Sequence, residues 1–365
     1  MENKKLHGGD IYGFDMEKQN KILDYSSNIN PLGVSSNLKQ NIMENFHLLE
    51  KYPDVNYLEL RKNIGKFNSV DLNEIVVGNG AVEVLFLYIK ALSPKSAMII
   101  SPTFAEYERA LKNIDCKISY HELYEKDDFR LDRERVLKEL GDEELVVLCN
   151  PNNPTGKFIP LDEIEKLNKE LEERGKKLFI DECFIEFIEG WEELSASLLK
   201  SKNIFILRAF TKFFGIPGLR LGYGITFDEK IQKKIDEIRE PWSINSFAEL
   251  GGKTLLWDRE YIEKTYLWIN EEKKWFYNEL GKNSNLKVYK TETNFILLKL
   301  LNTTSEDFRK KMLEGDILVR DASNFKFLDN SFVRLAVKNR ENNIKIIKKI
   351  QEATDGSDIN SRSWK

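Results

Sequence analysis

Short apolar runs alternate with helical patterns between about residues 71 and 226, and this alternation restricts the fold more than any other feature of the chain. The apolar, β-rich runs are residues 74–77, 97–101, 144–149, 177–180, 203–207 and 221–226, and the helical patterns are residues 81–92 and 161–174. Strands that alternate with helices form parallel sheets whose two faces are covered by the helices. We therefore predict an α/β fold with a large, doubly wound and mainly parallel sheet.

The pattern changes after Pro241. Helical patterns within residues 247–280 precede strand-like runs at 286–289, 294–300, 317–320 and 332–337, which indicates a second, smaller α+β domain. The first 40 or so residues carry loop signals and precede the large sheet, so we expect them to pack with that domain. The expected boundaries are 44–240 for the large domain, 1–43 and 241–353 for the small domain with its amino-terminal arm, and 354–365 for a frayed tail.

Composition excludes several classes of function. The chain has 365 residues, of which 41% are hydrophobic, so it can bury a large core. Its net charge of −4 is spread along the chain, which argues against a nucleic-acid or membrane-surface protein. Cys116, Cys149 and Cys183 are far apart and odd in number, so we expect neither disulfides nor a metal site. The sequence has no apolar signal region or membrane-spanning stretch, and we expect a cytoplasmic protein.

Lys212 follows the expected strand 203–207, within the segment RAFTKFFGIPGLRLGYG at residues 208–224. Ligands of doubly wound sheets bind beyond the carboxyl ends of the strands, which is where this lysine is expected. An apolar pocket would lower the pKa of its ammonium group, which suits imine formation. Taken alone, Lys212 is more simply interpreted as a surface lysine, and three further segments change that interpretation.

The first of these segments is LFIDECF, in which Asp181 directly follows an apolar strand. A carboxylate is costly in that place unless it has a partner. A protonated pyridine nitrogen would be such a partner, because a fixed anion keeps the ring cationic and electron-accepting. The alternative is a carboxylate that caps the following turn.

The other two segments are NPNNPTG at residues 150–156 and GNGAVE at residues 78–83. Asn153 lies between a strand and a helix, where its amide could donate to an oxygen of a cofactor ring; the alternative is an ordinary turn rich in Asn, Pro and Gly. GNGAVE opens a helix after a strand, and free backbone amides at a helix amino terminus bind phosphate.

In this order and spacing the segments resemble the fold-type-I enzymes that use pyridoxal 5′-phosphate (PLP), which have the aspartate-aminotransferase fold, and the resemblance covers nearly the whole chain. It implies that Lys212 carries the cofactor as a Schiff base and that Asp181 faces the pyridine nitrogen. It also implies that Phe104 stacks on the ring and that Asn153 bonds its 3′ oxygen. The implied phosphate contacts are Gly80, Ala81, Thr211 and Arg220, with Tyr52 reaching the cofactor of the neighbouring subunit in a homodimer.

Within this fold the chain resembles the histidinol-phosphate aminotransferase group, and most of all the threonine-phosphate decarboxylases of cobalamin synthesis. The stretches that carry the likeness are HGGD (7–10), DYSSNINPLG (24–33), TKFFGIPGLRLGYG (211–224) and ILVRDASNF (317–325). The implied substrate-binding residues are His7, Gly8, Asn30, Arg320, Asn324 and Arg334. Arg334 would bind the substrate carboxylate through a bidentate fork and Arg320 its phosphate. The alternative for Arg320 is an ion pair with Asp316 or Asp321.

Two residues depart from the patterns of relatives: Phe184 stands where the aminotransferases typically carry Tyr, and Ala209 where relatives usually have Ser or Thr. The implied reaction is decarboxylation of L-threonine O-3-phosphate to (R)-1-aminopropan-2-ol O-phosphate and CO2. The alternatives are histidinol-phosphate transamination with 2-oxoglutarate, decarboxylation of O-phosphoserine, and a catalytically silent protein. Decarboxylation and transamination use the same catalytic residues, Lys212 and Asp181, so the residues alone do not separate these two reactions.

Overall fold

A computed structural model describes residues 8–355 of the chain. His7, which the sequence places near the substrate, lies outside the described residues. The last helix, α12 (Arg340–Thr354), includes the first residue of the predicted tail, and residues 356–365 of that tail also lie outside.

The larger sheet has seven strands within residues 8–355, in the order β2-β8-β7-β6-β5-β3-β4. Its strands are β2 (Ile75–Gly78), β3 (Ser96–Ser101), β4 (Lys117–Glu122), β5 (Leu145–Cys149), β6 (Lys177–Asp181), β7 (Ile204–Ala209) and β8 (Gly222–Thr226). The five strands β7, β6, β5, β3 and β4 pair parallel with one another, whereas β8 pairs antiparallel with both β2 and β7. The mainly parallel sheet predicted from the alternating pattern is therefore present.

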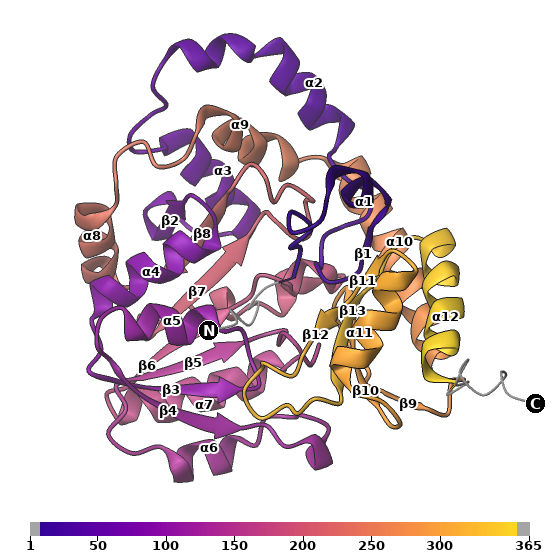
Figure 1. Ribbon diagram of the computed structural model, residues 1–365. Coiled ribbons are helices and arrows are strands. Elements are labelled where there is room, and N and C mark those ends of the chain that lie inside the picture. Colours follow the sequence, from indigo (N-terminus) through magenta and orange to yellow (C-terminus); the bar gives the residue numbers. More distant parts are fainter. Residues whose placement is uncertain (1–7, 356–365) are drawn as a thin grey trace, which may run out of the picture.

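Burial on both faces explains why these strands are almost continuously apolar. Every residue of β5, β7 and β8 is buried. The helices beside the sheet are α3 (Leu58–Asn68), α4 (Ala81–Leu92), α5 (Glu106–Lys112), α6 (Arg133–Glu139), α7 (Leu161–Glu173) and α8 (Glu229–Ile238), and Figure 1 shows several of them packed along the strands. Tyr88 of α4 stacks on Phe205 of β7 at 4.1 Å between ring centroids, which fixes that helix on the sheet.

The smaller sheet has the strand order β12-β13-β10-β9. Its elements are β9 (Leu286–Val288), β10 (Phe295–Leu300), β12 (Arg320–Asp321) and β13 (Phe332–Ala336), with α10 (Arg259–Leu280), α11 (Ser305–Glu314) and α12. The single strand expected at 317–320 is divided between two sheets. β11 (Ile317–Leu318) pairs with the arm strand β1 (Leu23–Asp24), whereas β12 pairs with β13 so that Arg320 lies opposite Arg334.

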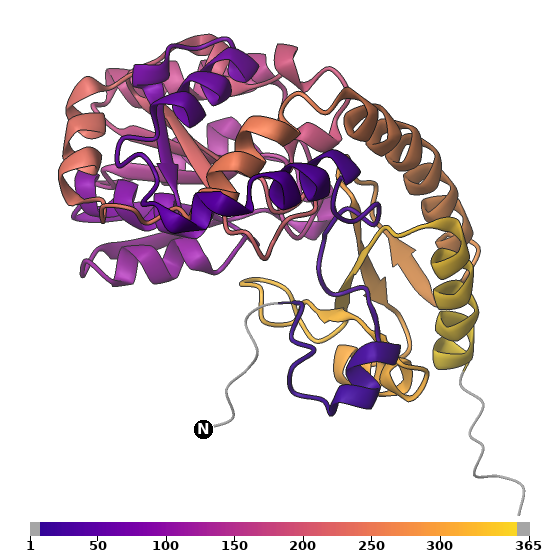
Figure 2. The same cartoon turned by 90° about the horizontal axis from the view of Figure 1, so that it is seen from above.

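The amino-terminal segment lies beside this smaller sheet, as Figure 2 shows for its indigo part. It contains α1 (Met16–Lys21), β1 and α2 (Ser36–Glu44), and α2 packs against α9 (Ser246–Leu255). Short 3₁₀ helices lie at Phe46–Glu50, Leu72–Glu74, Glu125–Asp127, Ile185–Phe187, Trp191–Glu193 and Ala196–Leu199.

The domain boundaries at 43/44 and 240/241 stay a prediction. None of the helices in the described part of the chain has the length and apolar character that a bilayer crossing requires.

Candidate active site

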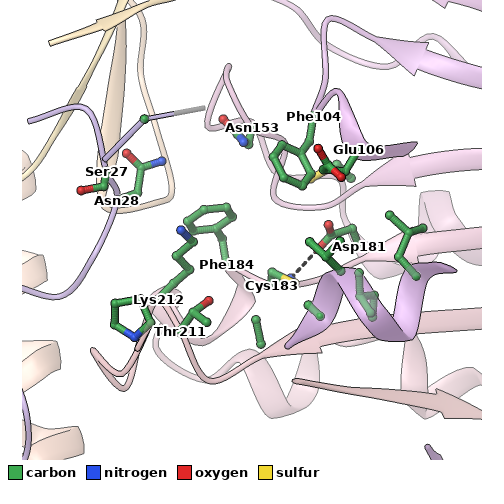
Figure 3. Close-up of a pocket in the computed structure, with 18 of the residues that line it drawn as sticks. Ser27, Asn28, Phe104, Glu106, Asn153, Asp181, Cys183, Phe184, Thr211 and Lys212 are labelled. Atoms are coloured by element: carbon green, nitrogen blue, oxygen red, sulfur yellow. Dashed lines mark hydrogen bonds between the residues drawn. The ribbon is translucent and has the colours of Figure 1, made fainter. Parts of the chain in front are cut away.

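A cavity of about 470 Å³ opens at the carboxyl ends of β5, β6 and β7. Parallel strands end at the same edge of a sheet, so polar residues at those ends converge there. Figure 3 shows Lys212, Asn153, Phe104 and Asp181 around one open space. The residues of the sequence prediction that line the cavity are Gly8, Ala81, Phe104, Asn153, Asp181, Thr211, Lys212, Arg220, Arg320 and Arg334.

The amino terminus of α4 forms an anion cradle at one end of the cavity. No side chain caps this helix, so the first backbone N–H groups after Gly80 are available to a ligand. Gly80 has φ +90°, and a Cβ there would lie 2.3 Å from Nη2 of Arg220. Only glycine therefore lets the guanidinium approach the backbone so closely. Ala81, Thr211 and Arg220 line this end, and together they suit a phosphate dianion.

Asp181 is the last residue of β6 and is only 6% exposed. Its Oδ1 accepts a hydrogen bond from the backbone N–H of Cys183 at 2.8 Å (Figure 3), and its Oδ2 accepts one from the phenol of Tyr107 at 2.6 Å. Burial raises the pKa of the Asp181 carboxyl group. A cationic N–H group in the cavity would offset this cost, because opposite charges in a buried site favour each other's ionised forms.

Lys212 lies in the turn that follows β7, with its side chain in the cavity. Burial, and next the positive charge of Arg334, lower the pKa of the Lys212 ammonium group to about 8. An amine with this pKa is more readily deprotonated than an ordinary lysine, which suits a nucleophile and proton donor.

Arg334 in β13 is a buried guanidinium at the other side of the cavity. Nη1 donates to Oδ1 of Asn153 and Nη2 to the backbone carbonyl of Ser26 at 2.8 Å, whereas Nε has no partner. Burial, and next the charge of Arg320, lower the pKa of Arg334 to about 9. A buried cation of this kind is stabilised by an acid that the ligand brings.

Arg320 lies opposite Arg334 on the neighbouring strand and is only 6% exposed. Nη1 donates to the backbone carbonyl of Asp321 at 2.6 Å and Nη2 to Oδ1 of Asn324 at 2.8 Å. Burial lowers the pKa of Arg320 to about 10. The structure thus brings two arginines to one wall of the cavity, and Asn324 orients one of them.

Asn30 does not line the cavity, although the sequence suggested it as a substrate contact. Its Nδ2 donates to the carbonyl of Phe213 and to Oγ1 of Thr265, both at 2.8 Å, and its Oδ1 accepts from Leu32 N–H at 3.0 Å. Every polar atom of this side chain is therefore used to hold the turn that carries Lys212.

Asn28, two residues earlier, lines the cavity instead, and sequence reasoning missed it. It is 2% exposed, and its Oδ1 is buried without a hydrogen-bond partner. Figure 3 shows Asn28 and Ser27 on the side of the space opposite Phe104 and Asp181. A buried amide oxygen that lacks a partner in the protein is available to a ligand in the cavity.

The amino-terminal arm reaches the cavity at Gly8, which lies against Ser26. A Cβ at Gly8 would come 2.1 Å from the carbonyl oxygen of Ser26, and Gly9 N–H donates to Oγ of Ser26 at 2.7 Å. The two glycines therefore permit a close approach of the arm that a larger residue would prevent.

Tyr52 lies outside the cavity and is 80% exposed. Its ring is 4.9 Å from that of Trp242, which is half exposed. Other exposed apolar side chains of the same segment are Met43, Phe46 and Leu49. Grouped exposed apolar residues mark protein contact surfaces, so a role for Tyr52 depends on a second subunit.

The two departures from the patterns of relatives both line the cavity. Phe184 lies 5.1 Å from Phe295 between ring centroids and offers no hydroxyl group, and Ala209 ends β7 just before Thr211. Other residues that line the cavity offer such donors: Asn153 has an amide and Thr211 a hydroxyl group.

The family model described as aminotransferase class I and II matches residues 20–350. The "Putative threonine-phosphate decarboxylase" of Caldanaerobacter subterraneus is 42% identical and is matched over 94% of this chain and 93% of that protein. The threonine-phosphate decarboxylase of Salmonella typhimurium is 33% identical over 92% of each chain. These matches confirm the resemblance inferred from the sequence.

Among solved structures, the histidinol-phosphate aminotransferase of Clostridium acetobutylicum has a TM-score of 0.87 and 39% identity, over 92% of this chain and 99% of that one. The L-threonine-O-3-phosphate decarboxylase of Porphyromonas gingivalis has a TM-score of 0.79 and 28% identity, over 90% and 98%. Aspartate aminotransferase of Thermus thermophilus, in a double-mutant form, has a TM-score of 0.82 at 18% identity, over 94% and 95%. The predicted aspartate-aminotransferase fold is confirmed.

Proposed function

The chain belongs to the class I and II aminotransferase family, and we propose that it decarboxylates L-threonine O-3-phosphate to (R)-1-aminopropan-2-ol O-phosphate and CO2. Pyridoxal 5′-phosphate is its cofactor. The cavity fits this group, because it offers a phosphate cradle at Gly80, a buried carboxylate at Asp181 and an amine at Lys212. We assign the reaction to cobalamin biosynthesis in the cytoplasm on the resemblance alone.

The observation that carries the proposal is the pair of buried arginines on adjacent strands. Arg334 and Arg320 face each other in register, and both line the cavity. L-Threonine O-3-phosphate has two acid groups, a carboxylate and a phosphate, that could use one arginine each. Histidinol phosphate has a phosphate but no carboxylate, so in the rival transamination both arginines would meet an acid group only in the half-reaction with 2-oxoglutarate.

The residues of the chain have separate tasks in this reaction. When bound, the cofactor supplies an electron-accepting ring that is conjugated to the substrate nitrogen. Arg334 and Arg320 would hold the two ends of the substrate, and in that way they would orient its Cα bonds relative to the ring. Loss of CO2 leaves an electron pair on Cα, and Nζ of Lys212 would deliver the proton that replaces the carboxylate.

The test is product analysis with O-phospho-L-threonine, with and without 2-oxoglutarate. We expect CO2 and one equivalent of the amine phosphate without an acceptor. Formation of glutamate, with the acceptor required, would favour the second candidate, histidinol-phosphate aminotransferase. That candidate is supported by the 39% identity to the enzyme of C. acetobutylicum. O-Phosphoserine in the same assay tests whether the substrate methyl group matters.

Replacing Arg320 with alanine should raise the KM for O-phospho-L-threonine while leaving cofactor occupancy unchanged. Loss of a hydrogen bond to a charged group costs about 1.5–3 kcal/mol, or roughly a tenfold to hundredfold rise in KM. Steady-state kinetics and the cofactor absorbance measure the two effects. Arg334→Ala should weaken the binding of phosphorylated and plain amino acids alike. Arg259→Ala, outside the cavity, serves as the control. Unaltered kinetics in Arg320→Ala would contradict a phosphate-binding role.

Asn28 and Asn30 form a matched pair for testing which asparagine contacts the substrate. Asn28→Ala should raise the KM for O-phospho-L-threonine and leave the melting temperature nearly unchanged, because Asn28 lines the cavity and its amide oxygen has no partner in the protein. Asn30→Ala should lower the stability by about 1–3 kcal/mol, because it leaves buried partners unsatisfied. Thermal unfolding and kinetics of both variants separate the roles, and a reversed result would restore Asn30 as the contact.

We also propose a homodimer in which Tyr52 of each subunit reaches the other subunit's cofactor phosphate. Support comes from the exposure of Tyr52 and the apolar side chains around it. Sedimentation should give twice the chain mass. Tyr52→Ala should weaken cofactor binding, and mixed dimers of Tyr52→Ala with Lys212→Ala should regain activity, because one composite site is intact. A fully active monomer would rule the proposal out.

A further inference from the structure

Tyr107 is a buried phenol at the floor of the cavity, and nothing in the proposed reaction uses it yet. It lies in α5, three residues after Phe104, and is 1% exposed. Its hydroxyl donates to Oδ2 of Asp181 at 2.6 Å. The ring packs edge-on against Phe104 and Phe179, at centroid distances of 5.7 and 5.9 Å, so aromatic neighbours on two sides fix its orientation.

Asp181 can serve a cationic ring nitrogen only while it is ionised, and its burial opposes that state. Hydrogen bonds donated to a carboxylate favour the ionised form. The donors are the backbone N–H of Cys183, the thiol of Cys183 and the phenol of Tyr107. The other titratable groups around the carboxylate are the thiols of Cys149 in β5 and Cys183 and the ammonium group of Lys212.

We propose that Tyr107 is a positioning residue whose phenol keeps the Asp181 carboxylate ionised and aimed at the pyridine nitrogen of the cofactor. The inference rests on the proposed function only through the placement of that nitrogen against Asp181. Two observations suit this role. Tyr107 and Asp181 both line the cavity, and Cys183 N–H holds the second carboxylate oxygen, so the carboxylate cannot rotate without breaking a bond.

A purely structural role for Tyr107 gives a different expectation. In that case the ring fills space between Phe104 and Phe179, and the hydroxyl merely satisfies its own hydrogen bond. Tyr107→Phe keeps the ring and its packing and removes only the oxygen. A structural role would therefore leave the kinetics and the cofactor spectrum of the folded variant unchanged.

The test compares parent and Tyr107→Phe holoenzymes. We expect kcat to fall about tenfold or more with little change in KM, as for loss of one hydrogen bond to a charged group. Tyr107 lowers the pKa of Asp181, so its removal raises that pKa, and the ionised carboxylate is lost at a higher pH. The acidic limb of the kcat profile should therefore move up by about one pH unit. The absorbance of the bound cofactor, titrated without substrate, should shift in the same direction.

Two controls decide between the outcomes. Tyr223→Phe removes another buried phenol, paired with Asn68 and outside the cavity, and should lower the melting temperature without altering the spectrum. Asp181→Asn, measured in parallel, tests the site itself. If Asp181→Asn is strongly impaired but Tyr107→Phe keeps parental kcat and titration, this inference is overturned. If Asp181→Asn is fully active, the proposed site assignment fails first.

If Tyr107→Phe does not fold, a second experiment tests the proposal. Site-specific replacement of Tyr107 by 3-fluorotyrosine makes the phenol a stronger donor at nearly the same size. The acidic limb and the spectral titration should then move to lower pH, opposite to the effect of removing the hydroxyl group. No shift in either direction would contradict the proposal.

Discussion

Lys212→Ala is expected to give a folded protein that binds the cofactor only reversibly and does not turn over. The side chain projects into the cavity, so its removal leaves the packed core intact. Burial lowers the pKa of the ammonium group to about 8, and alanine offers neither the amine nor the proton that Cα requires. Removal of a residue that acts as nucleophile and proton donor should cost at least on the order of 10³-fold in kcat.

The measurements for this variant are kinetics, the absorbance of the protein after dialysis, and its response to borohydride. The parent should retain a coloured cofactor that borohydride fixes covalently, and the variant should lose it on dialysis. Lys338→Ala is the matched control, because burial also lowers the pKa of Lys338, which donates to the carbonyl of Ser27 but does not line the cavity. Full activity in Lys212→Ala would invalidate the whole site assignment.

Asp181→Asn is expected to lose most of the rate while the fold is retained. The amide has nearly the same shape, and its oxygen can still accept from Cys183 N–H. It cannot hold the proton on a pyridine nitrogen, so the electron-accepting ring is weakened. Loss of an electrostatic partner of this kind costs on the order of 3–4 kcal/mol in the barrier, or about 10²–10³ in kcat.

The same variant should behave differently without cofactor. Burial raises the pKa of Asp181 above its value in the unfolded chain. An acid whose pKa is higher in the folded than in the unfolded chain contributes most to the free energy of unfolding when the pH is below its pKa in the unfolded chain. This contribution is lost as the pH rises through its pKa in the folded protein. At neutral pH the cofactor-free Asn variant should therefore be at least as stable as the parent, even though it binds the cofactor more weakly.

Thermal unfolding of the parent and of Asp181→Asn, each with and without cofactor, checks these opposite effects on stability and on cofactor binding. Asp228→Asn is the control for a capping role, because Asp228 caps α8 by accepting from the N–H groups of Lys230 and Ile231. A kcat of Asp181→Asn within a factor of two or three of the parent would mean that Asp181 is only a turn cap like Asp228.

The sequence alone determined the fold class and the polar positions at the strand ends. Continuous apolar runs mark strands buried on both faces, which is why β5, β6 and β7 could be located within two residues of their ends. β4 was missed because it is an edge strand whose residues are mostly half buried, so its sequence KISYHE carries polar residues throughout. α5 was missed because it has only seven residues.

Only the tertiary structure decided how distant segments meet. Asn28 and Asn30 are two residues apart in one loop, so no local pattern tells which one faces a ligand. The structure directs Asn30 to Phe213 and Thr265 and leaves Asn28 against the cavity. The expected strand at 317–320 reads as one run, yet β1 and β13 each pair with one part of it, which places Arg320 opposite Arg334. Such pairings join segments far apart in the chain. The alternation within one segment sets which side chains share a face, but it does not say which distant strand the segment pairs with.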